Sequence, residues 1–137
     1  MSAPRRRVLL RSLAPLALMG AIFYLSAQPA DADQAWWTVV LRKLGHVGGY
    51  ATLTALWTWA LAGTVRRPLL NAAAISFVYA CSDEYHQSFV GTRHGSPVDV
   101  AVDAIGIGLA YLILKAAKTE RRKDAGRPAK RAHLKRA

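Results

Sequence analysis

The chain has 137 residues, 53% of them hydrophobic, and a formal net charge of +11 at pH 7. This length predicts one small domain, and the one cysteine excludes an intrachain disulfide. The apolar residues gather into four blocks that lack charged faces, whereas the helices of a soluble bundle carry apolar stripes beside charged faces. The composition therefore predicts an all-α, polytopic membrane protein with about four transmembrane helices.

The first apolar block, residues 8–27, follows a basic segment. This pattern is also typical of a secretory signal peptide, and Ala-x-Ala at residues 30–32 is a tolerable cleavage site, so retention and cleavage both stay open. A polar joint follows, with a pair of tryptophans at residues 36–37 that is typical of a membrane interface. The second apolar block then covers residues 47–63.

The third block, residues 69–81, follows Pro68, which suits the first position of a helix. It is short for a membrane span, so we expect its helix to include polar residues such as Ser82 and Asp83. Next comes a polar joint with glycines at residues 91 and 95. Serine, proline and aspartate at residues 96, 97 and 99 then form a pattern typical of a helix start.

The fourth block therefore runs from about residue 97 to residue 114, and the chain from Lys115 onward is basic. We divide the protein into a membrane domain, residues 1–114, and a basic, flexible cytoplasmic tail, residues 115–137. The tail is expected to bind anionic lipids of the inner leaflet. It lacks interleaved aromatic residues, so we do not expect it to bind nucleic acid.

Charge distribution predicts the orientation of the four spans. Lys and Arg are enriched on the cytoplasmic side of membrane proteins. Four spans place both ends of the chain on one side, and sixteen of the nineteen Lys and Arg residues fall on that side. Both termini are therefore expected in the cytoplasm, and six of the eight acidic residues on the outer side.

The polar residues at the outer ends of the second to fourth blocks are the candidate site, because charges beside apolar segments are costly unless they pair or face water. Spacings of three and four put the first group, at residues 43–50, on one helix face. The two aspartates of the fourth block share a face that Gly106 and Ala110 continue. The candidates are Lys43, His46, Tyr50, Asp83, Glu84, Gln87, Arg93, Asp99 and Asp103.

Within this set, Asp103 lies about 6 Å deeper than Asp99 at 1.5 Å per residue. We expect it to face the bundle interior with a cation as its partner, and Lys43, Arg93 and His46 are available. The same charges could instead be structural ion pairs that fix the helix register. Histidines and acids could supply metal ligands, but no tightly spaced motif is present, so neither a metal site nor another cofactor is predicted.

At these residues the chain resembles the VanZ-like family of small bacterial membrane proteins, over roughly residues 8–114. The resemblance lies in Ser26-x-Gln28-Pro29, in Lys43-x-x-His46-x-x-x-Tyr50-x-x-Leu53, and in Ser82-Asp83-Glu84-x-x-Gln87-x-Phe89, Gly91-x-Arg93 and Ser96-x-x-Asp99-x-x-x-Asp103-x-x-Gly106. Val90 stands where family members often have proline, and Asp103 where they often have asparagine. The resemblance implies a multi-pass protein of the bacterial cytoplasmic membrane, and a link to resistance to the glycopeptide teicoplanin.

Three functions follow as hypotheses. The first is an outward-facing polar site that engages an envelope lipid or a cell-wall precursor, with Lys43 and Arg93 meeting its phosphate or carboxylate. The second is an enzyme that acts on a lipid or lipid-linked substrate, with His46 and the acids transferring protons. The third is a non-catalytic accessory or transporter subunit whose charges are ion pairs between helices.

Overall fold

The structure, a computed structural model, describes residues 3–28, 35–90 and 95–134, with side chains described for residues 6–28, 35–90 and 95–126. The described residues form four helices and contain no strand, so the all-α prediction is confirmed. The helices are α1 (Ala3–Ser26), α2 (Trp36–Leu61), α3 (Pro68–Gln87) and α4 (Pro97–Leu134).

The starts of the last two helices lie where the sequence predicts them. α3 begins at Pro68 and continues to Gln87, so it includes the polar residues at its end. α4 begins at Pro97, and the Oγ of Ser96 accepts a hydrogen bond from the backbone N–H of Val98 at 3.1 Å. Ser96 therefore caps a helix N-terminus whose backbone N–H groups have no partner within the helix.

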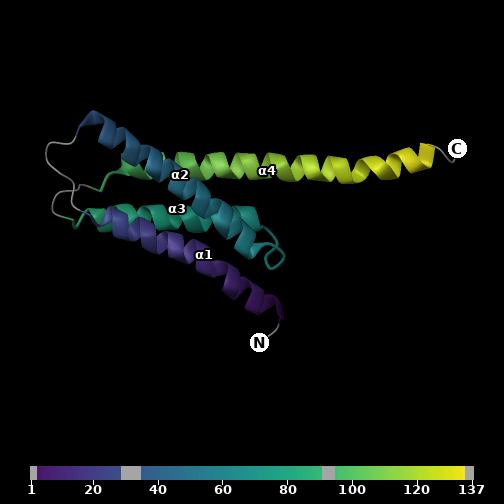
Figure 1. Ribbon diagram of the computed structural model, residues 1–137, viewed down its shortest axis with the longest axis horizontal. Coiled ribbons are helices and arrows are strands. Elements are labelled where there is room, and N and C mark those ends of the chain that lie inside the picture. The colour runs from purple at the N-terminus through teal and green to yellow at the C-terminus, as the bar shows by residue number, and fades with distance from the viewer. Residues whose placement is uncertain (1–2, 29–34, 91–94, 135–137) are drawn as a thin grey trace.

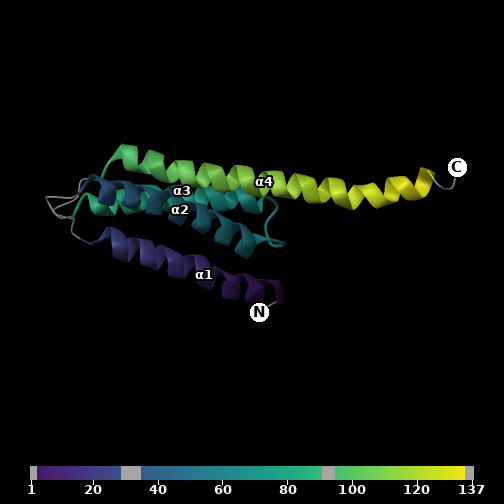
Figure 2. The ribbon, with the colours of Figure 1, turned by 45° about the horizontal axis from the view of Figure 1, so that its top comes forward.

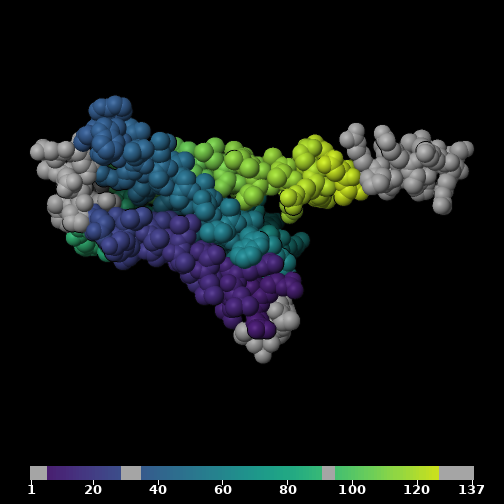
Figure 3. Space-filling model, in the orientation of Figure 1, coloured from purple at the N-terminus to yellow at the C-terminus, as the bar shows by residue number. Residues whose placement is uncertain are grey.

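Two helices are longer than their apolar blocks. α2 begins at Trp36, eleven residues before the second block, so the arginine and lysine of that stretch lie within the helix. α4 does not end at Leu114 but continues to Leu134 through the basic segment. Lys and Arg are good helix formers, so a change from apolar to basic residues does not end a helix. All residues from Lys115 to Gly126 are exposed, and Figure 3 shows this stretch projecting from the bundle.

α1, α2, α3 and the first half of α4 form one bundle (Figures 1 and 2). α2 packs against all three other helices, α3 also packs against α4, and α1 packs mainly against α2. The bundle therefore has a core of α2, α3 and α4, with α1 lying along one side. The second half of α4 extends beyond the bundle (Figure 1).

The interior of this bundle is as polar as it is apolar. Its apolar centre is formed by Tyr50, Leu53, Ala80 and Ile107. Among the described side chains, seven polar or charged ones are also buried, as many as the buried hydrophobic ones. The described surface in contrast exposes twenty-four large hydrophobic side chains, spread over all four helices. A soluble monomer rarely exposes so much apolar area, whereas a bilayer would cover it.

Length and composition identify two helical segments that could cross a membrane, Arg6–Ser26 with 21 residues and Pro97–Gly126 with 30. A signal sequence or the core helix of a soluble protein passes the same test. The two apolar segments agree with a membrane location.

Candidate functional site

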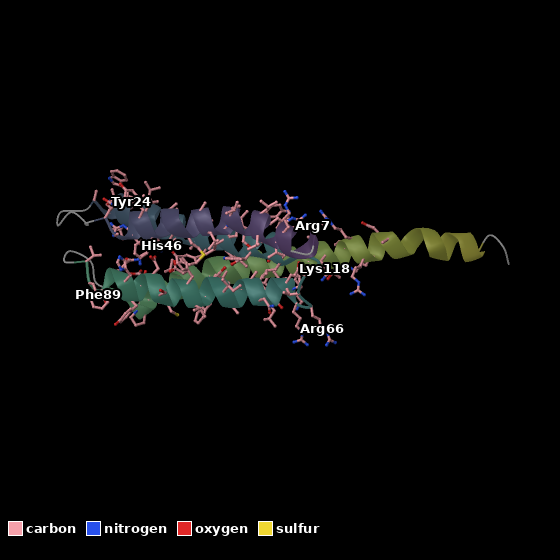
Figure 4. All side chains as sticks on the ribbon, turned by 90° about the horizontal axis from the view of Figure 1, so that it is seen from below. Arg7, Tyr24, His46, Arg66, Phe89 and Lys118 are labelled. Carbon is pink, nitrogen blue, oxygen red and sulfur yellow. The ribbon has the colours of Figure 1, made fainter. Side chains whose placement is uncertain are left out.

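Eight of the nine predicted site residues lie in the described part of the chain, and Arg93 lies outside it, as do Pro29 and Gly91 of the quoted motifs. The eight come from three helices, and side-chain contacts join seven of them into pairs and a small network. Figure 4 shows His46 at the same end of the bundle as Tyr24 and Phe89. The site is thus built where the C-terminal ends of α1 and α3 meet the N-terminal parts of α2 and α4.

The outermost contact joins α2 to α4. Nζ of Lys43 lies 2.5 Å from Oδ1 of Asp99, and both side chains are partly exposed, by 46% and 34%. An ion pair at this exposure contributes little to stability, about 0.2–1 kcal/mol. Lys43 was expected to meet a ligand phosphate or carboxylate, but in the structure its ammonium already has a carboxylate partner.

One helical turn deeper, a second pair joins the same two helices. Nδ1 of His46 lies 2.9 Å from Oδ1 of Asp103, whose side chain is 0% exposed. Asp103 thus faces the interior, as expected, and its side chain has a partner there. His46 is the partner among the three candidates. An imidazole held through Nδ1 has a fixed orientation, which leaves Nε2 for other contacts.

The end of α3 contributes a network of buried polar side chains. Asp83, Glu84 and Gln87 are all buried. Nε2 of Gln87 donates to Oε1 of Glu84 at 3.0 Å and to Oδ2 of Asp83 at 3.3 Å. The other oxygen of Glu84, Oε2, accepts from the backbone N–H of Ser96 at 3.2 Å, just before α4 begins. α3 and the start of α4 are therefore tied together by Glu84.

Ser26, at the end of α1, also belongs to the site, although it was not among the predicted site residues. It is 2% exposed, and its Oγ donates to Oδ1 of Asp83 at 2.5 Å. A serine at the end of an apolar helix carries no charge, so the cost of placing charges beside apolar segments does not single it out. The signal was present in the Ser26-x-Gln28-Pro29 motif. Through Ser26 all four helices contribute to the site.

Tyr50 fills the space beneath these pairs. It is fully buried, and its ring centroid lies 6.3 Å from that of His46 and 6.1 Å from that of Tyr79. Its hydroxyl lies in the electrostatic field of Asp83, Asp103 and Glu84 and has no hydrogen-bond partner among the described residues. A buried hydroxyl without a partner costs about 1–3 kcal/mol, so Tyr50 is a costly polar group within the described part of the site.

Two glycines allow the backbones around the site to approach closely. A Cβ added to Gly106 would fall against the carbonyl oxygen of Val47, next to His46, and 2.9 Å from its carbonyl carbon. A Cβ added to Gly95 would fall against the carbonyl oxygen of Glu84 and 3.2 Å from the backbone nitrogen of Ser88. Small residues let helices pack at short distance, and here they set the separations of α2 from α4 and of α3 from α4.

A cleft of about 220 Å³ opens beside the polar residues, between α1 and α2. Its walls combine apolar side chains, helical glycines and polar groups. His46 belongs both to this cleft and to the pair with Asp103, so the cleft leads to the buried cluster. The lining residues are Ile22, Leu25, Ser26, Arg42, Gly45, His46, Gly49 and Tyr50.

No metal site was predicted, because the sequence has no closely spaced ligand motif. In the folded chain, however, His46 and the adjacent acids Asp83 and Glu84 each offer one ligand atom, and these atoms lie within 4.8 Å of one another. Helix packing brings together residues that are 37 and 38 positions apart in the sequence. Spacing along the chain could not have shown this.

Comparison with known proteins agrees with the earlier resemblance. The model of the VanZ/LLP1 family matches residues 11–118. A membrane protein of Bacillus subtilis (strain 168), YwnJ, which is described as uncharacterized, is 40% identical over 78 residues. These residues are 57% of this chain and 51% of the relative, so the chain spans about half the length of that protein. None of the solved structures matches the chain.

Proposed function

Because the chain belongs to the VanZ/LLP1 family and is a membrane protein, we propose that it spans the bacterial cytoplasmic membrane four times and binds an envelope lipid. The outward-facing polar site would bind the head group of the lipid or of a lipid-linked cell-wall precursor. The cleft between α1 and α2 carries this proposal, because it joins an apolar wall to the polar cluster.

The lengths of the helices support four spans. At 1.5 Å per residue, the 20 residues of α3 cover about 30 Å, which is the thickness of the hydrocarbon core. α2 with 26 residues is longer. Exposed large hydrophobic side chains occur on both of these helices, as on α1 and α4. Neither α2 nor α3 is apolar throughout. Lys43 and His46 of α2 pair with α4, and Asp83 and Glu84 of α3 are buried.

The distribution of basic residues supports the orientation. Arg7, Arg66 and Lys118 come from α1, from the joint before α3 and from α4, and all lie toward the end of the bundle opposite His46 (Figure 4). Since Lys and Arg mark the cytoplasmic side, the end that carries His46 would face outward. Envelope lipids and precursors exposed on the outer leaflet would then reach the cleft from the side.

The lining of the cleft suits an amphiphile with an anionic head group. Ile22 and Leu25 offer an apolar wall, and Gly45 and Gly49 leave room along α2. Arg42 would bind a phosphate or carboxylate, which a guanidinium recognises through paired hydrogen bonds. A volume of about 220 Å³ is below the roughly 300–1,000 Å³ of drug-sized ligand sites. The cleft would therefore hold a head group and the first part of a chain.

Filling the cleft tests this proposal directly. Gly45→Leu places a side chain in the cleft. Gly48→Leu is the matched control, because Gly48 lies on the same helix but does not line the cleft. A Cβ added at either glycine meets nothing within 4 Å. Detergent-purified protein is titrated with phosphatidylglycerol, cardiolipin, an isoprenyl phosphate, and phosphatidylcholine as a neutral lipid. Native mass spectrometry and thermal shifts report binding.

An anionic lipid should bind to and stabilise the wild type and Gly48→Leu, and lose this effect in Gly45→Leu. Equal responses of the two variants would exclude the cleft. A second arm measures teicoplanin susceptibility at equal expression. If Arg93→Ala and Glu84→Gln leave both susceptibility and lipid binding unchanged, the proposed link to glycopeptide access to the envelope is wrong.

An enzyme that acts on a lipid or lipid-linked substrate is the second candidate, and the His46–Asp103 pair favours it. A histidine oriented by a carboxylate and exposed to a cleft is a suitable general base. This function requires turnover of a defined lipid by the purified protein, and His46→Ala should abolish it. By contrast, an accessory or transporter subunit with structural ion pairs is favoured by the Lys43–Asp99 contact. Such a subunit should copurify with a stoichiometric partner protein.

The basic end of α4 has a separate proposed role. The side chains from Lys115 to Gly126 are exposed, and the helix projects from the bundle at the end opposite His46 (Figure 4). Basic residues beside a span attract anionic lipids by about 1 kcal/mol each. A peptide of residues 115–137 should therefore bind phosphatidylglycerol vesicles at low salt, bind them weakly at high salt, and not bind phosphatidylcholine vesicles.

A further inference from the structure

The buried end of the bundle gathers possible metal ligands from two helices. His46 of α2 and the acids Asp83 and Glu84 of α3 each offer a ligand atom within 4.8 Å of the other two. Both acids are buried and the histidine is partly buried. We propose that these three side chains bind one divalent transition-metal ion of the zinc type. This inference is independent of the proposed lipid ligand.

Two further oxygen atoms at the cluster support a bound ion. Oδ2 of Asp103 and the hydroxyl of Tyr50 are buried and have no hydrogen-bond partner among the described residues. Both side chains are 0% exposed. The other oxygen of Asp103 lies 2.9 Å from His46, so Oδ2 lies beside the same imidazole. A water bound to the ion would supply hydrogen-bond donors to buried oxygens of this kind, which are costly to leave without a partner.

The pair of His46 with Asp103 is the arrangement that metal-binding histidines usually have. Such a histidine donates its second ring N–H to a carboxylate, which fixes the tautomer and makes the ligating nitrogen more basic. Here Nδ1 faces Asp103, which leaves the lone pair on Nε2 for an ion. Asp103 is thus a positioning residue for His46.

The two carboxylates are held in a similar way. Asp83 accepts hydrogen bonds from Ser26 and Gln87, and Glu84 accepts them from Gln87 and the backbone of Ser96. Each carboxylate oxygen has a second lone pair that remains for a metal ion. Ligating carboxylates in metal sites are themselves hydrogen-bonded in this way.

Distances and charge fit an ion of this kind. Zinc binds nitrogen and oxygen at about 2.0–2.2 Å, which places tetrahedral ligand atoms about 3.4 Å apart. The present ligand atoms are separated by at most 4.8 Å, a difference that side-chain rotation can close. One imidazole and two carboxylates suit zinc better than magnesium, which prefers oxygen ligands in an octahedron. Two positive charges would balance Asp83 and Glu84, and three protein ligands leave one position open.

Zinc binding to the purified full chain tests the site. The protein carries a tag without histidines and is stripped of metal with a chelator in lipid-free detergent. Native mass spectrometry measures stoichiometry, and isothermal titration with zinc chloride measures affinity. We expect one zinc ion per chain. Cobalt(II) added in place of zinc should give the visible absorption of a tetrahedral ion with nitrogen and oxygen ligands.

The variants separate the cluster from other histidines. His46→Ala and Glu84→Gln should each lower zinc affinity by at least tenfold, and Asp103→Asn by 10–100-fold as expected for a residue that orients a ligand. His86→Ala is the matched control, because His86 stacks on Phe23 at 4.2 Å between ring centroids and is not part of the cluster. It should bind zinc as the wild type does.

Several results would overturn the proposal. These are an absence of saturable zinc binding, wild-type affinity in both His46→Ala and Glu84→Gln, or loss of binding in His86→Ala alone. Far-UV circular dichroism checks folding. If His46→Ala does not fold, the zinc affinity of the isosteric variant Glu84→Gln and the cobalt spectrum of the wild type decide whether the cluster binds the ion. Zinc binding without any lipid effect would retain this site and remove the lipid proposal, and a lipid effect without zinc binding would do the reverse.

Discussion

The close approach of α4 to α2 at Gly106 should control the stability of the site. Gly106→Ala introduces a Cβ against the backbone of Val47, within 3.0 Å of three of its atoms. Gly108→Ala is the matched control, two residues along the same helix, where an added Cβ meets nothing within 4 Å. The effect of glycine to alanine on helix propensity, about 0.5–1 kcal/mol in favour of alanine, is shared by both variants. Comparison of the two therefore isolates the steric term.

Overpacking of a well-packed contact costs about 1–3 kcal/mol. We therefore expect the free energy of unfolding of Gly106→Ala to be about 1–3 kcal/mol lower than that of Gly108→Ala. Reversible unfolding of the two proteins in mixed micelles, followed by circular dichroism, measures the difference. Because Gly106 lies one turn from Asp103, displacement of α4 should also lengthen the bond to His46, which the ¹⁵N chemical shifts of that ring report.

Equal unfolding free energies for the two variants would refute the reasoning, since they would mean that α4 does not contact α2 at Gly106. A lower stability with an unchanged His46 spectrum would retain the packing contact. It would also show that the contact does not set the geometry of the site.

Three further predictions concern neighbouring contacts. Lys43→Asp and Asp99→Lys should each destabilise the protein. The double swap should restore at most about 1 kcal/mol of stability, because the pair is partly exposed, and the amount restored should be smaller at high salt. Ser26→Ala should cost about 1–3 kcal/mol by removing the 2.5 Å hydrogen bond to buried Asp83, and a double-mutant cycle with Asp83→Asn should show this coupling. Gly95→Ala should destabilise by about 1–3 kcal/mol, because its Cβ would collide with the backbone carbonyl oxygen of Glu84 in α3. Urea or detergent unfolding curves check all three predictions. A single variant that unfolds at the wild-type midpoint would contradict the prediction made for it.

The sequence predicted the parts of this fold that depend on local chemistry. Pro68 and Ser96 mark helix starts because a missing N–H and a capping hydroxyl act within one turn. Helical periodicity placed Gly106 and Ala110 on the face of Asp103, and both are buried. The inward position of Asp103 followed from the cost of a charge in an apolar segment, and the structure confirms it.

Other features could not be predicted because they depend on how the helices pack. Nothing in the sequence distinguishes His46 from Lys43 as the partner of Asp103; the choice follows from the register of α2 against α4, which the contact at Gly106 fixes. The approach of His46 to Asp83 and Glu84 likewise depends on the packing of α2 against α3. The ends of α2 and α4 differ from the ends of the apolar blocks because hydropathy reports the surroundings of a helix and not its boundaries.

The position of His46 links the proposals for this protein. Its imidazole lies between the cleft that opens beside α1 and the carboxylates of α3 and α4. With zinc on Nε2, the ion would present its open coordination position near the cleft, where a phosphate head group could bind it, and His46 would not act as a base. Without zinc, the same nitrogen would be a base oriented by Asp103. Lipid binding measured with and without zinc therefore separates the two mechanisms. If zinc strengthens the binding of a phosphate lipid and Glu84→Gln loses this effect, the metal mechanism is favoured. If zinc does not change lipid binding, the histidine mechanism is favoured.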